Sequence, residues 1–125
     1  MKRNIKFKAK RLDNGEWVKG DLVHSTSYVG ISYSSNEFSD VPIVHRVDPE
    51  TVCMFTGLKD CDGNEIYEGD IIDFDICLCS VVWVDGVCAF CLKNTTLEAS
   101  GTTPLGVMLD YYNKHKVLGS IYDSK

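Results

Sequence analysis

Residues 5–10 read Ile5-Lys6-Phe7-Lys8-Ala9-Lys10, an alternation of apolar and basic side chains. Because successive side chains of a strand point to opposite faces, this period of two predicts a half-buried β-strand. Asp13-Asn14-Gly15 follows, and Asn and Gly tolerate the positive φ angles of a tight turn. Residues 17–23 then continue as a second strand, which we expect Gly20-Asp21 to interrupt. The chain therefore opens with a β-hairpin.

Further strands are predicted where short apolar runs lie between turn residues. These runs cover residues 28–33, 41–47, 52–58, 66–67, 71–74, 79–84, 87–92 and 117–122. Asp85-Gly86 predicts a two-residue hairpin turn, which would place Trp83 opposite Cys88 and Ser80 opposite Cys91. With so many short strands, the fold class is mainly β.

One short helix is expected near residues 104–112. Thr103-Pro104 is typical of an N-cap followed by proline at the first helical position. Apolar side chains then recur at helical spacing, at Leu105, Met108, Leu109 and Tyr112.

A short sequence pattern occurs twice in the chain. Asp13, Glu16 and Gly20-Asp21 recur 49 residues later as Asp62, Glu65 and Gly69-Asp70. The pattern indicates either a structural repeat or convergent turn chemistry, since Gly adopts unusual backbone shapes and Asp accepts bonds from nearby main-chain amides. In both interpretations the Gly-Asp pair would bend the chain into the next strand.

Composition is that of an ordinary globular domain, with 44% hydrophobic and 25% charged residues in 125. The basic start has no apolar segment after it that could serve as a signal peptide, and no run of about 18 apolar residues predicts a membrane span. We therefore expect a cytoplasmic protein without membrane contact. Six cysteines in such a chain indicate reduced thiols rather than a disulfide framework.

The charge is unevenly distributed, although the net charge is only −5. Six of the 13 Lys and Arg residues lie in the first 11 positions, and the first acidic residue is Asp13. Residues 48–75 hold nine acidic residues and a single base, Lys59. Such asymmetry is typical of a polar interaction surface or of contact between copies of a chain.

No motif for catalysis, cofactor binding or metal binding is evident. Walker A, dinucleotide, nucleophile-elbow and His-Glu-x-x-His patterns are all missing, and His24, His45 and His115 lie in distant segments. Cys77, Cys79, Cys88 and Cys91 have spacings that zinc accepts, but the predicted hairpin points Cys91 to the opposite face from the others. Buried thiols are favoured there, and a solvated acidic face is favoured over a divalent cation at Asp70, Asp73 and Asp75. We expect no enzyme activity, cofactor or metal.

Residues 47–72 carry a family resemblance. They read Val-Asp-Pro-Glu-Thr-Val-Cys-Met-Phe-Thr-Gly-Leu-Lys-Asp-Cys-Asp-Gly-Asn-Glu-Ile-Tyr-Glu-Gly-Asp-Ile-Ile. This stretch resembles the central signature of the YopX family of phage and prophage proteins, and residues 5–9 and 117–122 are similar to that family's first and last strands. Cys53 and Cys61 depart from the pattern, which has a small or polar residue and a charged or polar one there.

The resemblance implies one YopX-like domain over residues 1–125, with an N-terminal β subregion at 1–58 and an SH3-like small barrel at 59–125. An N-terminal β-hairpin layer would accompany that barrel. Residues 68–72, the Asp85-Gly86 hairpin, the short helix and the last strand follow in the order of an SH3-like module. The family carries no established activity that could be transferred to this chain.

Lys6, Lys8, Lys10 and Arg11 form the candidate interaction surface. The three lysines would project from one face of a strand at intervals of about 6.6 Å, close to the phosphate repeat of a nucleic acid. Phe7 points to the opposite face, so no base-stacking ring is expected among them. Lysines that protect an exposed sheet edge from aggregation are the favoured alternative.

The function hypothesis is a phage- or prophage-derived accessory protein in the host bacterial cytoplasm, acting as a non-catalytic binding or assembly module. Its partners would be a second copy of the chain, as a homo-oligomer, and an unidentified protein. Two alternatives stay open: a nucleic-acid-associated protein that uses the basic strand, and an acidic DNA mimic that binds a host protein.

Overall fold

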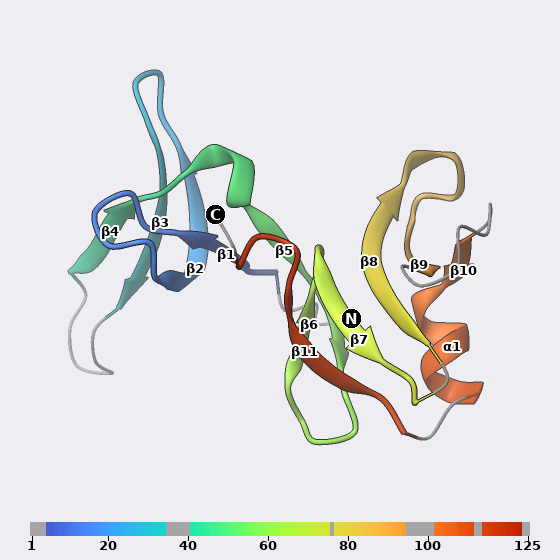
Figure 1. Ribbon diagram of the computed structural model, residues 1–125. Helices are drawn as coiled ribbons and strands as arrows, with labels where there is room; N and C mark the ends of the chain where they lie inside the picture. The colour runs from blue at the N-terminus through green and yellow to red at the C-terminus, as the bar shows by residue number, and fades with distance from the viewer. Residues whose placement is uncertain (1–4, 35–40, 76, 95–101, 112–113, 124–125) are drawn as a thin grey trace. The chain divides into compact units, whose positions relative to one another are not determined.

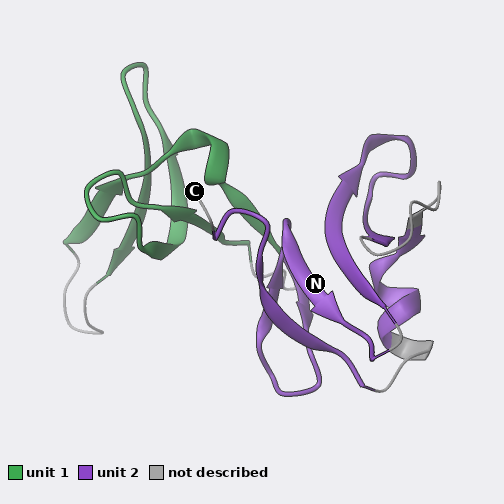
Figure 2. Cartoon of the chain, viewed as in Figure 1, with its two compact units in different colours: residues 1–55 green, residues 56–125 purple. Residues whose placement is uncertain are grey.

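The computed structural model describes residues 5–34, 41–75, 77–94, 102–111 and 114–123 (Figure 1). The strands form two antiparallel sheets, and the described residues include one short α-helix. The chain divides into two compact units, residues 1–55 and 56–125 (Figure 2). The prediction of a mainly β fold with one short helix is confirmed.

Unit 1 is an antiparallel sheet in the strand order β4-β3-β2-β1-β5. The strands are β1 (Phe7–Lys10), β2 (Trp17–His24), β3 (Val29–Ser34), β4 (Pro42–Arg46) and the first part of β5 (Cys53–Lys59). A single 3₁₀ turn, η1 (Pro49–Thr51), precedes β5 and is capped by the Asp48 carboxylate, which accepts a bond from the Glu50 amide. The opening hairpin is confirmed, and β1 lies between β2 and β5.

The core of unit 1 contains Ala9, Val18, Ile31 and Val47, all buried. Arg11 and Val47 form a β-bridge, and the Leu12 amide donates to the Arg46 carbonyl oxygen at 3.0 Å. These contacts join the end of β1 to the segment that follows β4. The sheet therefore curls around its apolar core rather than lying flat.

Unit 2 is an antiparallel sheet in the order β10-β9-β8-β7-β11, and it also contains the short β6. Its strands are β6 (Glu65–Tyr67), β7 (Asp70–Asp73), β8 (Leu78–Val84), β9 (Ala89–Asn94), β10 (Thr102–Pro104) and β11 (Lys116–Ser120). The helix α1 (Leu105–Tyr111) lies against β9 and β10 (Figure 1). Leu105 from this helix packs into a core with Ile66, Ile72, Val81 and Leu92.

The two Gly-Asp pairs have different structures. Gly69 has φ +85° in the turn between β6 and β7, and the buried Asp70 carboxylate there accepts the Tyr67 amide at 2.8 Å. Gly20-Asp21 instead lies inside the continuous strand β2. The expected bend is thus confirmed at residue 69, whereas β2 is not interrupted at residue 20: Gly20, with φ +159°, pairs with Phe7 of β1, and from Asp21 onward the strand pairs with β3.

The register of the β8–β9 hairpin differs from the prediction. Trp83 pairs with Phe90 and Val82 with Cys91, because the loop has four residues, 85–88, instead of two. A two-residue turn of the predicted type needs positive φ at its central residues. Here Asp85–Val87 form a 3₁₀ turn, η2, and the left-handed residue is Cys88, with φ +51°.

The helix also begins one residue later than predicted. Thr103-Pro104 belongs to β10, where Thr103 pairs with Leu92, so Thr103 is not a helix cap. The expected inward positions hold, because Leu105 is buried and Met108 and Leu109 pack against the core. Tyr112 lies outside the described residues.

Candidate interaction surface

Lys8 and Lys10 share one face of β1, and Lys6, the residue before the strand, continues the same alternation. The opposite face carries Phe7 and Ala9 and packs into the core of unit 1. Lys6 and Lys8 are half-buried, whereas Lys10 keeps only 7% of its surface exposed. The predicted lysine row therefore exists, but its third member is part of the packed interior.

Each of these ammonium groups lies over an aromatic ring. The Lys8 Nζ is 4.5 Å from the centre of the Trp17 ring, and the Lys10 Nζ is 5.6 Å from the same ring. The Lys6 Nζ is 5.0 Å from the ring centre of Phe55. Such cation–π contacts favour a lysine that is extended along the sheet surface over one that moves freely in water.

Two expectations about this strand are wrong. β1 is paired on both sides, with β2 and with β5, so its lysines do not protect a sheet edge. Aromatic rings do share the face of the lysines, because Trp17 and Phe55 arrive from the neighbouring strands. The prediction considered only residues of the same strand and missed these rings.

Lys19 lies directly opposite Lys8 in the β1–β2 register and therefore on the same face. The position of the Asp13-Asn14-Gly15 turn predicts the register of the two strands. That register could have identified Lys19 and also Trp17, which pairs with Lys10. We call this surface the lysine–aromatic face. Its accessible members are Lys6, Lys8, Trp17 and Lys19, and the buried Lys10 and Phe55 lie at its base.

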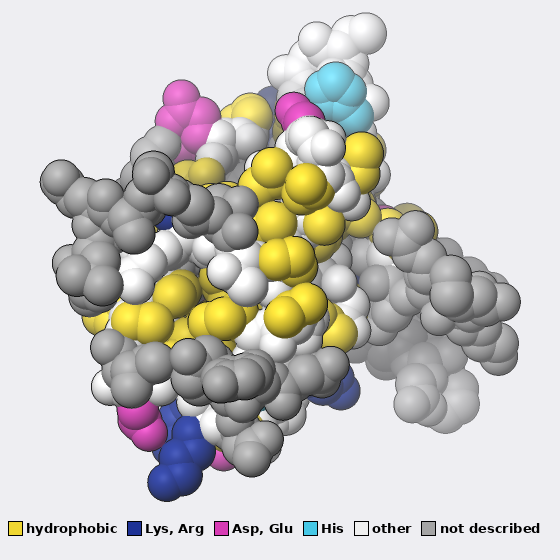
Figure 3. All heavy atoms as spheres, turned by 90° about the vertical axis from the view of Figure 1, so that its right-hand side faces the viewer, with side chains coloured by type: hydrophobic (Ala, Val, Ile, Leu, Met, Phe, Trp, Pro, Cys, Tyr) yellow, Lys and Arg dark blue, Asp and Glu magenta, His cyan; other side chains and the backbone are white. Residues whose placement is uncertain are grey.

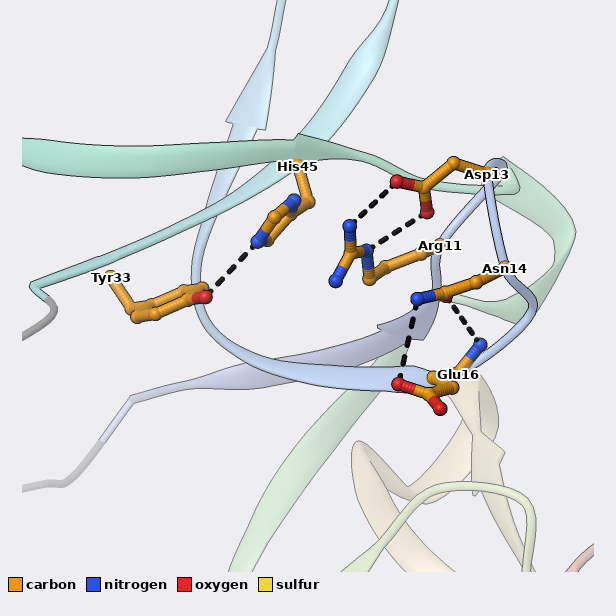
Figure 4. Close-up of polar contacts among 6 residues, drawn as sticks. All are labelled: Arg11, Asp13, Asn14, Glu16, Tyr33 and His45. Carbon is orange, nitrogen blue, oxygen red and sulfur yellow. Dashed lines mark hydrogen bonds and ion pairs between the residues drawn. The ribbon is translucent and has the colours of Figure 1, made fainter.

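Arg11, the fourth predicted residue, does not extend this face. Its side chain follows the opposite side of the strand from Lys10, and its Nε and Nη2 atoms donate to Asp13 at 2.9 and 2.6 Å (Figure 4). This bidentate ion pair raises the pKa of Arg11 and lowers the pKa of Asp13, mainly through the hydrogen bonds between the two side chains. The turn behind it is closed by the Glu16 amide, which donates to Asn14 Oδ1 at 2.9 Å.

Asp60, in the acidic stretch, is turned inward. Its carboxylate is 6% exposed and accepts four hydrogen bonds of 2.8–3.1 Å, from the amides of Asp62, Asn64 and Val117 and from the Asn64 side chain. Burial raises the pKa of Asp60, but the bonds from Val117 and Asn64 outweigh burial and leave this pKa below its usual value. The residue thereby fastens the β5–β6 turn to the start of β11.

Other acidic residues of the stretch are also engaged locally. Asp70 accepts the Tyr67 amide, and Asp73 accepts the Asp75 amide at 2.8 Å. Glu65 accepts the Tyr67 hydroxyl at 3.1 Å, and this bond adds to the burial that raises the pKa of the tyrosine. The acidic stretch of the sequence is therefore largely a set of backbone and side-chain anchors.

The cysteines do not assemble as a four-thiolate site. Cys77 and Cys79 lie on one face with their sulfur atoms 3.7 Å apart, and burial followed by the bond to Cys77 raises the pKa of Cys79 to about 12. Cys91 is buried on the other face, and Cys88 is exposed in the loop. Among the described residues, no three His, Cys, Asp or Glu side chains converge where a metal ion could bind.

Apolar side chains also reach the surface of unit 2. On the side that carries β8, β9 and α1, hydrophobic groups gather across the middle of the face (Figure 3). The large exposed members of these elements and their loop are Trp83, Val87 and Val107. Trp83 is held by an edge-to-face contact with Phe90 and a 2.6 Å bond to Asp85. No helix within the described residues is long and apolar enough to cross a membrane.

Comparison with known proteins identifies the family. A model described as YopX protein matches residues 6–125. The chain belongs to the YopX family. A search of curated proteins gave no match. The crystal structure of protein EF1440 from Enterococcus faecalis is similar at 19% identity over 98% of this chain and 96% of that chain, with a TM-score of 0.58. At that identity the similarity concerns the fold alone.

The two cysteines that depart from the YopX pattern have separate structural roles. Cys53 is fully buried, and its thiol donates to the Thr51 carbonyl oxygen at 3.2 Å. Cys61 is exposed, and its thiol donates to the His115 carbonyl oxygen at 2.9 Å. Both thiols therefore donate to backbone carbonyl oxygens.

Proposed function

We propose that this YopX-family protein is a non-catalytic binding or assembly module, carried by a phage or prophage and acting in the host cytoplasm. Its contact surface is the lysine–aromatic face. The observation that supports this role is that three lysine ammonium groups lie 4.5–5.6 Å from two ring centres on one side of a sheet. Side chains held in place lose less conformational entropy when a partner binds.

The partner is an acidic protein surface, since a row of cations on a sheet complements carboxylates. A second copy of the chain offers exposed carboxylates of this kind in unit 2, at Asp62 and Asp75. The protein is accordingly a homo-oligomer in this proposal. Size-exclusion chromatography with light scattering tests the assembly: a strict monomer at high concentration and low salt would contradict it.

An acidic peptide tests the face itself. Titration of a short polyglutamate peptide into ¹⁵N-labelled protein should shift the Trp17 indole N–H and the amides of Lys6 and Lys8 in a saturable way. The double variant Lys6→Gln/Lys8→Gln should lose these shifts. Lys59→Gln, an exposed lysine at the end of β5, is the matched control and should retain them. A titration without saturable shifts at low salt contradicts the proposal.

Nucleic acid is the second candidate, because the Trp17 ring lies among the lysines and single-stranded binders combine cations with stacking rings. Oligothymidylate is the probe. Binding through two or three lysines should weaken with salt at a slope of about −0.7 per phosphate contact. Flat binding curves at low salt would eliminate this candidate and leave the protein partner.

We further propose that unit 2 is an SH3-like small barrel. The strand order supports this assignment: β7, β8, β9 and β10 form a meander, a short helix follows, and β11 returns to pair with β7. Among the described residues no pairing closes the sheet between β10 and β11.

A further inference from the structure

A hollow of about 400 Å³ lies in unit 1, between the β1–β2 loop and β4. It is lined by Leu12, Asp13, Val44, His45 and Arg46. The Leu12 amide bonds to the Arg46 carbonyl oxygen at 3.0 Å, which fastens the loop against the strand. The walls of the hollow thus come from two segments that are joined through the backbone.

Every polar group of the hollow is held by a neighbour. Arg11 binds both carboxylate oxygens of Asp13, and the Tyr33 hydroxyl lies 3.0 Å from Nε2 of His45 (Figure 4). In the same view the Arg11 guanidinium lies between Asp13 and the Tyr33–His45 pair. The Arg46 guanidinium lies 4.8 Å from the ring centre of Tyr28. These contacts orient the side chains before any ligand arrives.

The charge of the hollow favours an anion. Asp13 is neutralised by Arg11, and no carboxylate of the described residues pairs with Arg46. A guanidinium stacked on a ring presents its N–H donors edge-on, in the fork geometry that carboxylates and phosphates accept. The net effect is one cation that is available to a ligand.

The remaining wall is apolar and solvent-exposed. Leu12 keeps 63% of its surface exposed and Val44 keeps 43%, on two sides of the same hollow. Binding sites for small ligands combine such apolar contacts with a few oriented polar groups. A ligand that fits both features has an oxyanion attached to a short apolar body.

We propose that this hollow binds an oxyanion on an apolar body, either a carboxylate or a phosphate ester. Arg46 pairs with the oxyanion, and Leu12 and Val44 contact the apolar body. The Tyr33 hydroxyl and Nε2 of His45, 3.0 Å apart, hold the imidazole in place at the wall of the hollow. The site is separate from the lysine–aromatic face, so either can fail without the other.

The experiment is an NMR titration of the full chain with three small probes. N-acetyl-leucine carries the carboxylate and an apolar body, N-acetyl-leucinamide lacks the charge, and isobutyl phosphate carries the other oxyanion. N-acetyl-leucine should give saturable shifts at Leu12, Val44 and Arg46. The amide should bind at least about tenfold more weakly, which corresponds to the loss of one charged pair. The anion that binds more tightly shows whether the natural ligand carries a carboxylate or a phosphate ester.

Variants separate the site from non-specific binding. Arg46→Gln should weaken the better anion about tenfold, and Arg46→Lys should only partly restore it because lysine lacks the fork. Tyr33→Phe should weaken binding about threefold by releasing His45. Lys59→Gln, an exposed lysine outside both sites, should leave binding unchanged. The proposal is overturned if neither anion saturates, if the amide binds as well as the acid, or if Arg46→Gln binds like the wild type.

Discussion

The basic strand of unit 1 and the acidic stretch of unit 2 use their charges in opposite ways. Lys6 and Lys8 keep their ammonium groups on the sheet surface, over the rings of Phe55 and Trp17. Asp60 and Asp70 bury their carboxylates and accept backbone amides. In the sequence both regions look like charged surfaces; in the structure Lys6 and Lys8 stay partly exposed, whereas Asp60 and Asp70 are buried.

The difference follows from side-chain length and from the hydrogen-bonding needs of turns. A short carboxylate next to a turn can satisfy amides that have no partner in the sheet, and burial then strengthens these bonds. A lysine has no acceptor and a long apolar stem, so it lies across apolar surface and keeps its charge near water. A charge asymmetry in a sequence therefore indicates a surface more reliably for lysine than for turn-adjacent aspartate.

The largest effect is expected when the buried carboxylate of Asp60 is removed. Asp60→Ala leaves the amides of Asp62, Asn64 and Val117 without their acceptor. We expect a loss of about 3 kcal/mol in the free energy of unfolding, because several buried donors lose a charged partner. Urea denaturation followed by tryptophan fluorescence measures this loss. Asp62→Asn, an exposed residue of the same turn, is the control and should change stability little.

The same anchor predicts a pH dependence. The pKa of Asp60 is lower in the folded state than its ordinary value, so its contribution to stability is present above the unfolded pKa of about 3.9. That contribution is lost as the pH falls through the folded pKa. The stability difference between wild type and Asp60→Asn should therefore be largest near neutral pH and shrink below about pH 4. A difference that is constant from neutral to acid pH would contradict the account.

A smaller effect tests the β8–β9 loop. Cys88 adopts a left-handed backbone with φ +51°, and Gly15 has the equivalent position in the β1–β2 loop with φ +71°. Cys88→Gly should raise the unfolding free energy by up to about 1 kcal/mol, since glycine adopts this conformation without strain. Gly86 does not have a positive φ, so Gly86→Ala should be nearly neutral. If Gly86→Ala destabilises the protein more than Cys88→Ala does, the two-residue turn is correct instead.

The smallest expected effect concerns the outward lysines. Lys6→Gln/Lys8→Gln should change the unfolding free energy by less than about 1 kcal/mol, because both side chains lie partly in solvent, where a cation–π contact contributes little. Thermal denaturation measures this change. A loss as large as that of Asp60→Ala would mean that the lysines are structural anchors as well.

Local patterns predicted the elements of the fold better than the connections between them. The alternation at residues 5–10 and the spacing of Leu105, Met108 and Leu109 depend only on neighbouring residues, and both predictions are confirmed. The β8–β9 register depends on which loop residue takes positive φ, and a cysteine in that role leaves no sequence signal. Gly20 does not interrupt β2, because it pairs with Phe7 of β1 and the next residue already pairs with β3.

The candidate site was only partly predictable. The lysine row follows from the strand period, but the rings beneath it come from β2 and β5. The pairing of Lys10 with Trp17 could have been counted from the turn, whereas β5 pairs with β1 across 45 to 47 residues of sequence and has no local signal. The hollow beside Arg46 depends in the same way on the Arg11–Val47 bridge.

The most direct test of the central claim is the polyglutamate titration of wild type and Lys6→Gln/Lys8→Gln, followed at the Trp17 indole N–H. We expect a saturable shift in the wild type that weakens with salt and disappears in the double variant. An unchanged shift in the variant, or a wild-type spectrum that does not respond at low salt, would show that the lysine–aromatic face is not the binding surface.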